Sequence, residues 1–259
     1  MMKKFIDAFQ NLKYILRNYA SDRTQESQFR RFLQLQIEAH DVHKEVFAKY
    51  KNCYRGKPIA VFGSGPTLDK WQGKEDCIQI GVNGTFLSDK VDLDYLFIQD
   101  YDAKMLNQLE SQNRKPPHVF FGMHYMLPNV KPIPFCELDK FKAERYFFYD
   151  HPADPFPFEF TLDIATRPFI TYFSTIFVAL QFALYTHPQR IYIVGCDCTS
   201  GHFDSHKKNI HDKYEGNGDA MVERWRRFKL FADALYPDIE IVSVNPVGLK
   251  GLFKDEYNS

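Results

Sequence analysis

Short apolar runs alternate with polar or amphipathic stretches along the chain from Lys57 onward. Each run is mainly aliphatic or aromatic and is followed by turn residues, which is typical of strands buried on both faces of a parallel sheet. The alternation predicts an α/β fold that is Rossmann-like and doubly wound, with a mainly parallel sheet. The predicted strands are 59–63, 77–82, 95–98, 119–121, 190–195 and 239–244, and the predicted helices are a short one after Pro66, 102–112, 173–186 and 219–235.

Two segments lack this periodicity. Residues 124–170 are rich in proline and aromatic residues, and we expect a long excursion over the strand ends, which is uncommon unless it serves function. Residues 199–218 are polar and rich in histidine, and we expect a mobile loop.

The first 54 residues contain neither glycine nor proline and predict two helices. In the first, apolar residues recur at helical spacing from Phe5 to Leu16 beside a basic polar face. This helix either packs on the core or on another subunit of a homo-oligomer, or it lies on an anionic membrane surface. The second predicted helix covers 26–50. The chain therefore divides into an N-terminal helical appendage, 1–54, and an α/β domain, 55–259.

Composition limits the class of protein. Lys and Arg total 33 and Asp and Glu total 33, so the net charge gives no support for a nucleic-acid binder. Five cysteines form no paired motif, which fits a reducing compartment, and Cys196 and Cys198 are interpreted as small residues at a strand end. No signal peptide or bilayer-spanning stretch is evident, so we expect a cytoplasmic protein, with the first helix able to hold it at the inner face of the membrane.

A glycine turn, Gly63-Ser64-Gly65-Pro66-Thr67, follows the first predicted strand. Such a turn at a helix N-terminus can present backbone N–H groups to a phosphate. It can equally be a tight connection from strand to helix. The third glycine of the dinucleotide fingerprint and the Gly-Lys-Ser/Thr of the Walker motif are both absent.

Polar residues also follow the other predicted strands, at the edge where ligands bind in open parallel sheets. Each one is able to bond a base, a ribose or a phosphate, and their coincidence predicts a nucleotide site. They are Asn83, Gln99, Asp100, Asp197 and Asn245.

Several short motifs resemble the bacterial sialyltransferases of glycosyltransferase family 42 and the related motility-associated-factor domain, whose relatives include archaeal pterin pyrophosphokinases. The resemblance covers roughly residues 57–250. It rests on the glycine turn, on Val82-Asn83, on Ser174-Thr175 before an apolar helix, and on the run from Ile191 to Asp197. It implies a Rossmann-like domain that binds a cytidine monophosphate sugar, with nucleotide contacts at Gly63, Ser64, Gly65, Asn83, Ser174 and Thr175, and with Gly195 and Asp197 as the most specific match. The glycine turn and the strand ends add Pro66, Thr67, Gln99 and Asp100 as nucleotide-binding candidates.

The chain departs from this pattern after Asp197. The sialyltransferases have tyrosines there that bind the leaving phosphate, whereas Cys198-Thr199-Ser200 follow here and Tyr214 is the nearest tyrosine. The family also has a catalytic histidine before the last helix, and this loop offers His202, His206 and His211. Histidine suits the general base of glycosyl transfer, and we take His202, His206 and Asp197 as the catalytic candidates.

Two groups of residues could bind a metal ion. His202, Asp204 and His206 are close enough in sequence to hold a metal, or they belong to a solvated loop. Asp100 and Asp102 resemble a metal-nucleotide motif, although Asp102 is as well placed to cap a helix. We expect that no cofactor is required, with Mg²⁺ as an optional partner.

The favoured function is a glycosyltransferase that moves a sugar from a nucleotide donor to a cell-surface glycan or glycolipid such as a lipooligosaccharide. A CMP-sugar is the favoured donor, and CMP-sialic acid is one candidate. One alternative is an ATP-dependent pyrophosphokinase with Mg²⁺ between the phosphates. Another is a non-catalytic assembly protein that binds a nucleotide without turnover. Preference for cytidine nucleotides over ATP separates the first two.

Overall fold

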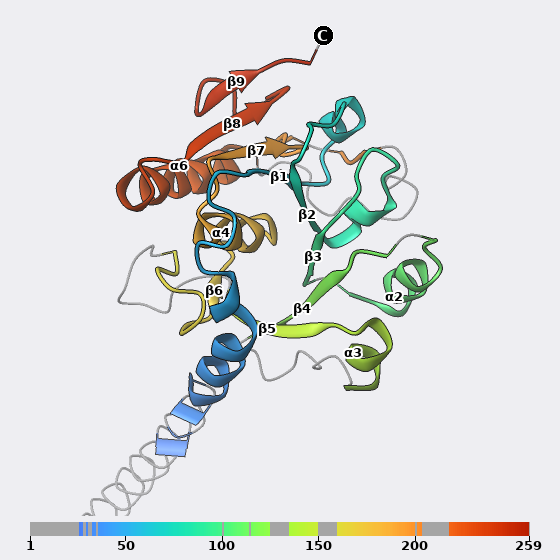
Figure 1. Ribbon diagram of the computed structural model, residues 1–259, viewed down its shortest axis with the longest axis vertical. Coiled ribbons are helices and arrows are strands. Elements are labelled where there is room, and N and C mark those ends of the chain that lie inside the picture. The colour runs from blue at the N-terminus through green and yellow to red at the C-terminus, as the bar shows by residue number, and fades with distance from the viewer. Residues whose placement is uncertain are drawn as a thin grey trace, which may run out of the picture.

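The structure is a computed structural model that describes residues 26–27, 30, 33–34, 36–99, 101–113, 115–124, 135–149, 160–199, 201–203 and 218–258. The described residues form a single sheet of nine parallel strands with helices on both faces (Figure 1). The expected Rossmann-like α/β fold is confirmed. The strands are β1 (Pro58–Phe62), β2 (Ile78–Val82), β3 (Tyr95–Ile98), β4 (His118–His124), β5 (Glu144–Tyr149), β6 (Phe169–Ile170), β7 (Arg190–Val194), β8 (Glu240–Val244) and β9 (Lys254–Glu256).

The order of the strands places a reversal at the centre of the sheet. The order is β6-β5-β4-β3-β2-β1-β7-β8-β9. The chain builds outward from β1 to β6, crosses back through helix α4 (Ile176–Thr186), and then builds outward on the other side from β7. The gap between β1 and β7 is therefore the topological switch point, where open α/β sheets leave a crevice beyond the carboxyl ends of the strands.

The strands bury alternate residues on opposite faces of the sheet. In β1, Ile59 and Val61 belong to one hydrophobic cluster, whereas Ala60 and Phe62 belong to the other. This period of two explains why the strand reads as a continuous apolar run. Helices α4 and α6 (Gly218–Leu235) supply side chains to the first cluster, and α2 (Ala103–Glu110) and α3 (Phe135–Phe141) supply side chains to the second.

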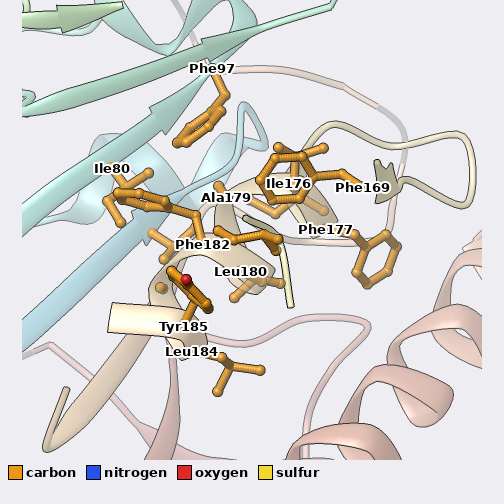
Figure 2. Packing of buried hydrophobic residues seen from close by; sticks show 14 of the residues in the cluster. Ile80, Phe97, Phe169, Ile176, Phe177, Ala179, Leu180, Phe182, Leu184 and Tyr185 are labelled. Atoms are coloured by element: carbon orange, nitrogen blue, oxygen red, sulfur yellow. The ribbon is translucent and has the colours of Figure 1, made fainter. Parts of the chain in front are cut away.

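Helix α4 is buried along its whole length. Its side chains pack beside Ile80, Phe97 and Phe169 of the strands (Figure 2). The single polar residue in its middle, Gln181, accepts a hydrogen bond from the Thr161 N–H at 2.9 Å and donates one to the Ile170 carbonyl at 2.7 Å. The helix therefore fixes β6 and the segment before it, and its N-terminus lies at the switch point.

The C-terminal part of the appendage packs into the core. Residues 36–47 are helical, and Phe47 and Tyr50 are buried in the cluster that contains α4. His43 is fully buried, accepts a hydrogen bond from the Phe147 N–H at 2.8 Å, and makes a second bond of 2.7 Å to the Ile164 carbonyl. Because one ring nitrogen accepts and the other donates, His43 is neutral. Its pKa is lowered to about 4, mainly by burial. The first predicted helix lies outside the described residues.

The sheet is larger than the sequence predicted. The segment 124–170, expected as an excursion without periodicity, contains α3, β5 and β6, and a further strand, β9, follows β8. The expectation for 124–170 is wrong, because β5 carries a buried aromatic run from Tyr146 to Phe148. Strand β6 has two residues and β9 is Lys-Asp-Glu, so neither shows a strand period, and only pairing with a neighbour defines them. Among the described residues, no helix is both long enough and apolar enough to traverse a bilayer.

Candidate functional site

A cleft of about 210 Å³ opens at the switch point, beyond the carboxyl ends of β1, β2 and β7. Its walls come from the turns that follow these strands, from the first turn of α4, and from Met221 and Trp225 of α6. Nine of the residues predicted from the sequence line it: Gly63, Ser64, Gly65, Asn83, Ser174, Thr175, Gly195, Asp197 and His202. Of the other predicted residues, Pro66, Thr67 and Gln99 do not line it, and Asp100 and His206 lie outside the described residues.

The turns after β1 and β7 interlock through their glycines. The Gly63 N–H donates to the Val194 carbonyl at 2.8 Å, and the Gly65 N–H donates to the Gly195 carbonyl at 2.7 Å. A Cβ atom on Gly63 would lie 2.6 Å from the Gly195 oxygen, which is closer than real contacts allow. These two amides therefore bond within the protein, as the tight-turn interpretation expects, and do not face a phosphate.

Asp197 closes the same turn from the β7 side. Its carboxylate accepts hydrogen bonds from the Thr67 N–H at 2.9 Å and from the Thr67 hydroxyl at 2.6 Å. Only 4% of Asp197 is exposed. The carboxylate thus satisfies an N–H group in the first turn of the 3₁₀ helix η2 (Pro66–Lys70), where free donors and partial positive charge favour an anion.

Asn83, Gln99 and Thr175 come from three separate strand or helix ends and bond to one another. The Asn83 side chain accepts from the Gln99 N–H at 3.0 Å and donates to the Thr175 hydroxyl at 3.1 Å. The Thr175 hydroxyl donates to the Gln99 side-chain carbonyl at 2.7 Å. This network joins the ends of β2 and β3 to the start of α4, so three residues predicted from separate motifs form one structural unit.

The backbone around the cleft is strained. Asn83, Tyr172, Phe173 and Cys198 have φ angles of 43°, 45°, 62° and 53°, a region that non-glycine residues rarely occupy. Such residues cost free energy and are concentrated at functional sites, where the surrounding structure holds them. The strained residues lie in three of the segments beside the cleft, because they follow β2, precede α4 and follow β7.

Three hydroxyl groups in the cleft remain available to a ligand. Ser64, Ser174 and Thr199 line the cleft, and their side chains make no hydrogen bond to the part of the chain that the structure describes. The sequence predicts Ser64 and Ser174 at the site, whereas Thr199 stands where the chain departs from the family pattern. These hydroxyls can each donate to and accept from a ribose or phosphate.

His202 lies over the glycine turn. The next residue, Phe203, is fully buried and donates its N–H to the Ser64 carbonyl at 3.0 Å, which anchors the segment to the turn. His206, His211 and Tyr214 lie outside the described residues. Asp102 caps α2, accepting from the Met105 N–H at 2.7 Å, so its capping role is confirmed. Within the described ranges, no three His, Cys, Asp or Glu side chains are grouped so as to hold a metal.

The apolar part of the cleft was not anticipated. Val82, Ile176, Met221 and Trp225 contribute to the wall, and the Trp225 ring packs 5.1 Å from that of Phe177. In the sequence, Met221 and Trp225 are ordinary apolar positions of a helix, and nothing distinguishes them from core residues. Only the placement of α6 beside the switch point brings them to the site.

Cys196 and Cys198 also line the cleft, and both are free thiols. Burial, followed by the neighbouring charge of Asp197, raises the pKa of Cys198 to about 12, and a hydrogen bond with Trp225 opposes this rise. Burial raises the pKa of Cys196 as well. Both are protonated near neutral pH and are poor nucleophiles, which agrees with the interpretation of small residues at a strand end.

No family model matches the chain, and no curated protein matches it in sequence. The solved structures similar to this chain include two glycosyltransferases. They are of the two kinds that its short motifs resemble.

One is the MAf glycosyltransferase from Magnetospirillum magneticum AMB-1, with 14% identity, a TM-score of 0.46, and a similarity that covers 85% of this chain and 38% of that chain. The other is the sialyltransferase CstII from Campylobacter jejuni in complex with a substrate analogue, CMP-3FNeuAc, with 16% identity, a TM-score of 0.43, and coverage of 77% of this chain and 85% of that chain. A mutant of CstII gives 15% identity and a TM-score of 0.41, with coverage of 72% and 81%. This chain thus spans well under half of the MAf glycosyltransferase, and the roles of its residues are argued from its own cleft.

Proposed function

We propose that this chain is a glycosyltransferase that binds a nucleotide sugar, with a cytidine nucleotide favoured, in the cleft between β1 and β7. The observation that carries the proposal is the position of the cleft. It lies at the switch point of a parallel sheet, the usual nucleotide site of such folds, and nine residues predicted from the sequence line it. The proposed acceptor is a glycan or glycolipid.

The cleft offers suitable surfaces for the parts of a nucleotide. Val82, Ile176 and Met221 give an apolar wall against which a base or ribose can pack, and Ser64, Ser174 and Thr199 give hydroxyl groups for the ribose or phosphate. The bonded network of Asn83, Gln99 and Thr175 keeps the wall in place. We assign these three, together with Asp197, to positioning, because their hydrogen bonds already join parts of the protein.

His202 is the proposed general base. In the reaction, the acceptor hydroxyl oxygen forms a bond to the anomeric carbon of the donor, and its proton passes to the imidazole. The bond between the anomeric carbon and the phosphate oxygen breaks, and the nucleotide leaves with the electron pair. Imidazole suits this task near neutral pH, and hydroxyl donors at the leaving phosphate stabilise the charge that develops there.

The first test is thermal stabilisation by a panel of CMP, CMP-sialic acid, UDP- and GDP-sugars, and ATP, each with and without Mg²⁺. A ligand at about a hundred times its dissociation constant adds about 2.7 kcal/mol of stability, which is readily seen. We expect the largest shift with the cytidine nucleotides, followed by release of CMP from CMP-sialic acid when a glycan acceptor is added. A shift selective for ATP would favour the pyrophosphokinase, and nucleotide binding without turnover would favour the assembly protein.

Variants connect the shift to the cleft. Ser174→Ala removes a hydroxyl that lines it, and we expect a smaller cytidine-dependent shift with little change in the stability of the free protein. Ser111→Ala is the control, because Ser111 ends α2 and does not line the cleft. Equal shifts in both variants would place the nucleotide elsewhere.

A further inference from the structure

Helix α6 carries three arginines in one turn, and they have different partners. Arg226 and Arg227 both lie 3.5 Å from the Glu223 carboxylate. Arg224 pairs with no carboxylate among the described residues. Its guanidinium instead lies over the ring of Phe173, 5.4 Å from the ring centre.

Both members of this pair belong to the rim of the cleft. Arg224 follows Met221, which lines the cleft, by three residues, so these two occupy neighbouring positions on one face of α6. Phe173 directly precedes Ser174, which also lines the cleft. The contact therefore joins the start of α4 to the start of α6 across one edge of the opening.

Phe173 is unusual for an apolar residue in both its exposure and its backbone conformation. Its side chain is 62% exposed, and its backbone φ is 62°, the second of two successive residues in the left-handed region. A ring this exposed contributes little to the hydrophobic core. It does provide a flat surface for a guanidinium, and stacking on such a face leaves the N–H groups around the guanidinium edge free to bind another partner.

The charges of the described cleft residues indicate the chemistry of that partner. Of the described residues that line the cleft, Asp197 has a carboxylate, which is occupied by Thr67, and none is lysine or arginine. Among these residues, a bound phosphate or carboxylate would therefore find hydroxyl groups but no permanent positive charge. Arg224 supplies that charge from the rim.

We propose that Arg224, braced by Phe173, is the anion-binding residue of this cleft and takes the phosphate or carboxylate of an acidic nucleotide-linked substrate. This inference rests on the proposed function for the nucleotide, and on the geometry of α6 for the anion. The proposed substrate therefore carries an acidic group that extends from the cleft toward α6.

The test measures affinity by calorimetry for ligand pairs that differ by one phosphate: CMP and cytidine, UMP and uridine, and AMP and adenosine, together with inorganic pyrophosphate and free sialic acid. The proteins are the full chain, Arg224→Gln, Arg224→Lys and Phe173→Leu. Arg226→Gln is the matched control, because it makes the same charge change two residues away on an exposed side chain paired with Glu223. Far-UV circular dichroism and melting confirm that each variant is folded.

In the wild type we expect the phosphate-bearing member of a pair to bind more tightly. Arg224→Gln should lose about tenfold or more of that preference, with Arg224→Lys and Phe173→Leu intermediate and Arg226→Gln unchanged. Loss confined to the phosphorylated ligands identifies the phosphate as the anion, and loss confined to sialic acid identifies the carboxylate.

The outcomes separate this inference from the proposed function. Binding of every ligand, free sialic acid included, that is equal in the wild type and Arg224→Gln overturns the role of Arg224 and leaves the nucleotide site standing. Pyrophosphate binding that Arg224→Gln removes, without any nucleotide binding, supports the anion site and overturns the nucleotide-sugar function. Absence of binding by every ligand in the wild type overturns both.

Discussion

The hydroxyl of Thr67 donates a 2.6 Å hydrogen bond to the carboxylate of Asp197, 130 residues further along the chain. A second bond of 2.9 Å joins the Thr67 N–H to the other carboxylate oxygen. The pair fastens the glycine turn of β1 to the turn after β7, directly beside the cleft.

Replacing Asp197 should therefore destabilise the protein as well as the site. Asp197→Asn puts an amide where the carboxylate accepts two hydrogen bonds, so one buried donor loses its acceptor, and we expect a loss of about 1–3 kcal/mol in the free energy of unfolding. Urea denaturation measures it. Thr67→Val removes the partner hydroxyl, and the double variant should lose clearly less than the sum of the two single variants. Strict additivity would mean that the bond contributes little.

Substitutions at two adjacent residues of the glycine turn should have different effects, one on the stability of the fold and the other on nucleotide binding. Gly65 has an ordinary φ of −71°, but a Cβ there would overlap the Asp197 carboxylate and lie 2.7 Å from the Gly195 oxygen. Gly65→Ala should consequently lower the melting temperature. Ser64→Ala removes only a hydroxyl that has no hydrogen bond to the described residues, so the melting temperature of the free protein should stay within about 1–2 °C while nucleotide-dependent stabilisation falls. The reverse pattern would refute the distinction between them.

The hydrogen bonds around Asn83 should affect nucleotide binding indirectly, because they hold the wall of the cleft in place. Asn83→Asp keeps the acceptor for the Gln99 N–H but removes the donor to Thr175, whereas Asn83→Ala removes both. We expect a graded loss of nucleotide affinity, with Ala worse than Asp, and a stability loss of about 1–2 kcal/mol for Ala. Calorimetric titration and urea denaturation give the two quantities. Unchanged affinity in both variants would exclude a positioning role.

The buried histidine of the appendage should make stability depend on pH. Because the pKa of His43 falls from 6.5 to about 4 in the folded protein, the unfolded chain takes up a proton first as the pH drops. His43 therefore contributes full stability above about pH 6.5 and loses it progressively toward pH 4, by about 3 kcal/mol in total.

His43→Gln should be less stable than the wild type at pH 7.5, yet lose less stability between pH 7.5 and 4.5. His40→Gln, an exposed histidine on the same helix, serves as the control and should follow the wild type. Denaturation midpoints across this range measure the effect. Identical pH dependence in His43→Gln and the wild type would contradict the assignment.

His202 should affect turnover and not binding. If it is the general base, His202→Gln should reduce the rate of sugar transfer by about 10²–10⁴-fold while nucleotide affinity changes little. Phe203 still anchors the segment through its bond to Ser64, so the fold should be unaffected. A transferase assay with CMP-sialic acid and calorimetry on the same preparation provide the comparison. A rate equal to the wild type would move the catalytic role to another residue.

The sequence by itself determined the α/β class, the six central strands and most of the cleft wall. It could do so because buried parallel strands are apolar runs ended by turn residues, and because their carboxyl ends gather at one edge of the sheet. Gly63, Asn83 and Thr175 could thus be assigned to one site although they are far apart in the chain. The capping role of Asp102 followed from local chemistry.

Only the tertiary structure decided the direction of the hydrogen bonds and the contribution of α6. The N–H groups of Gly63 and Gly65 are bonded to the β7 turn, and Asn245, expected at the site, instead holds the C-terminal segment, bonding to Glu256 and Asn258. Met221 and Trp225 reach the cleft because α6 packs beside the switch point, and strands β6 and β9 exist because a neighbour pairs with them. These features depend on contacts between residues distant in sequence, which neither periodicity nor a local motif encodes.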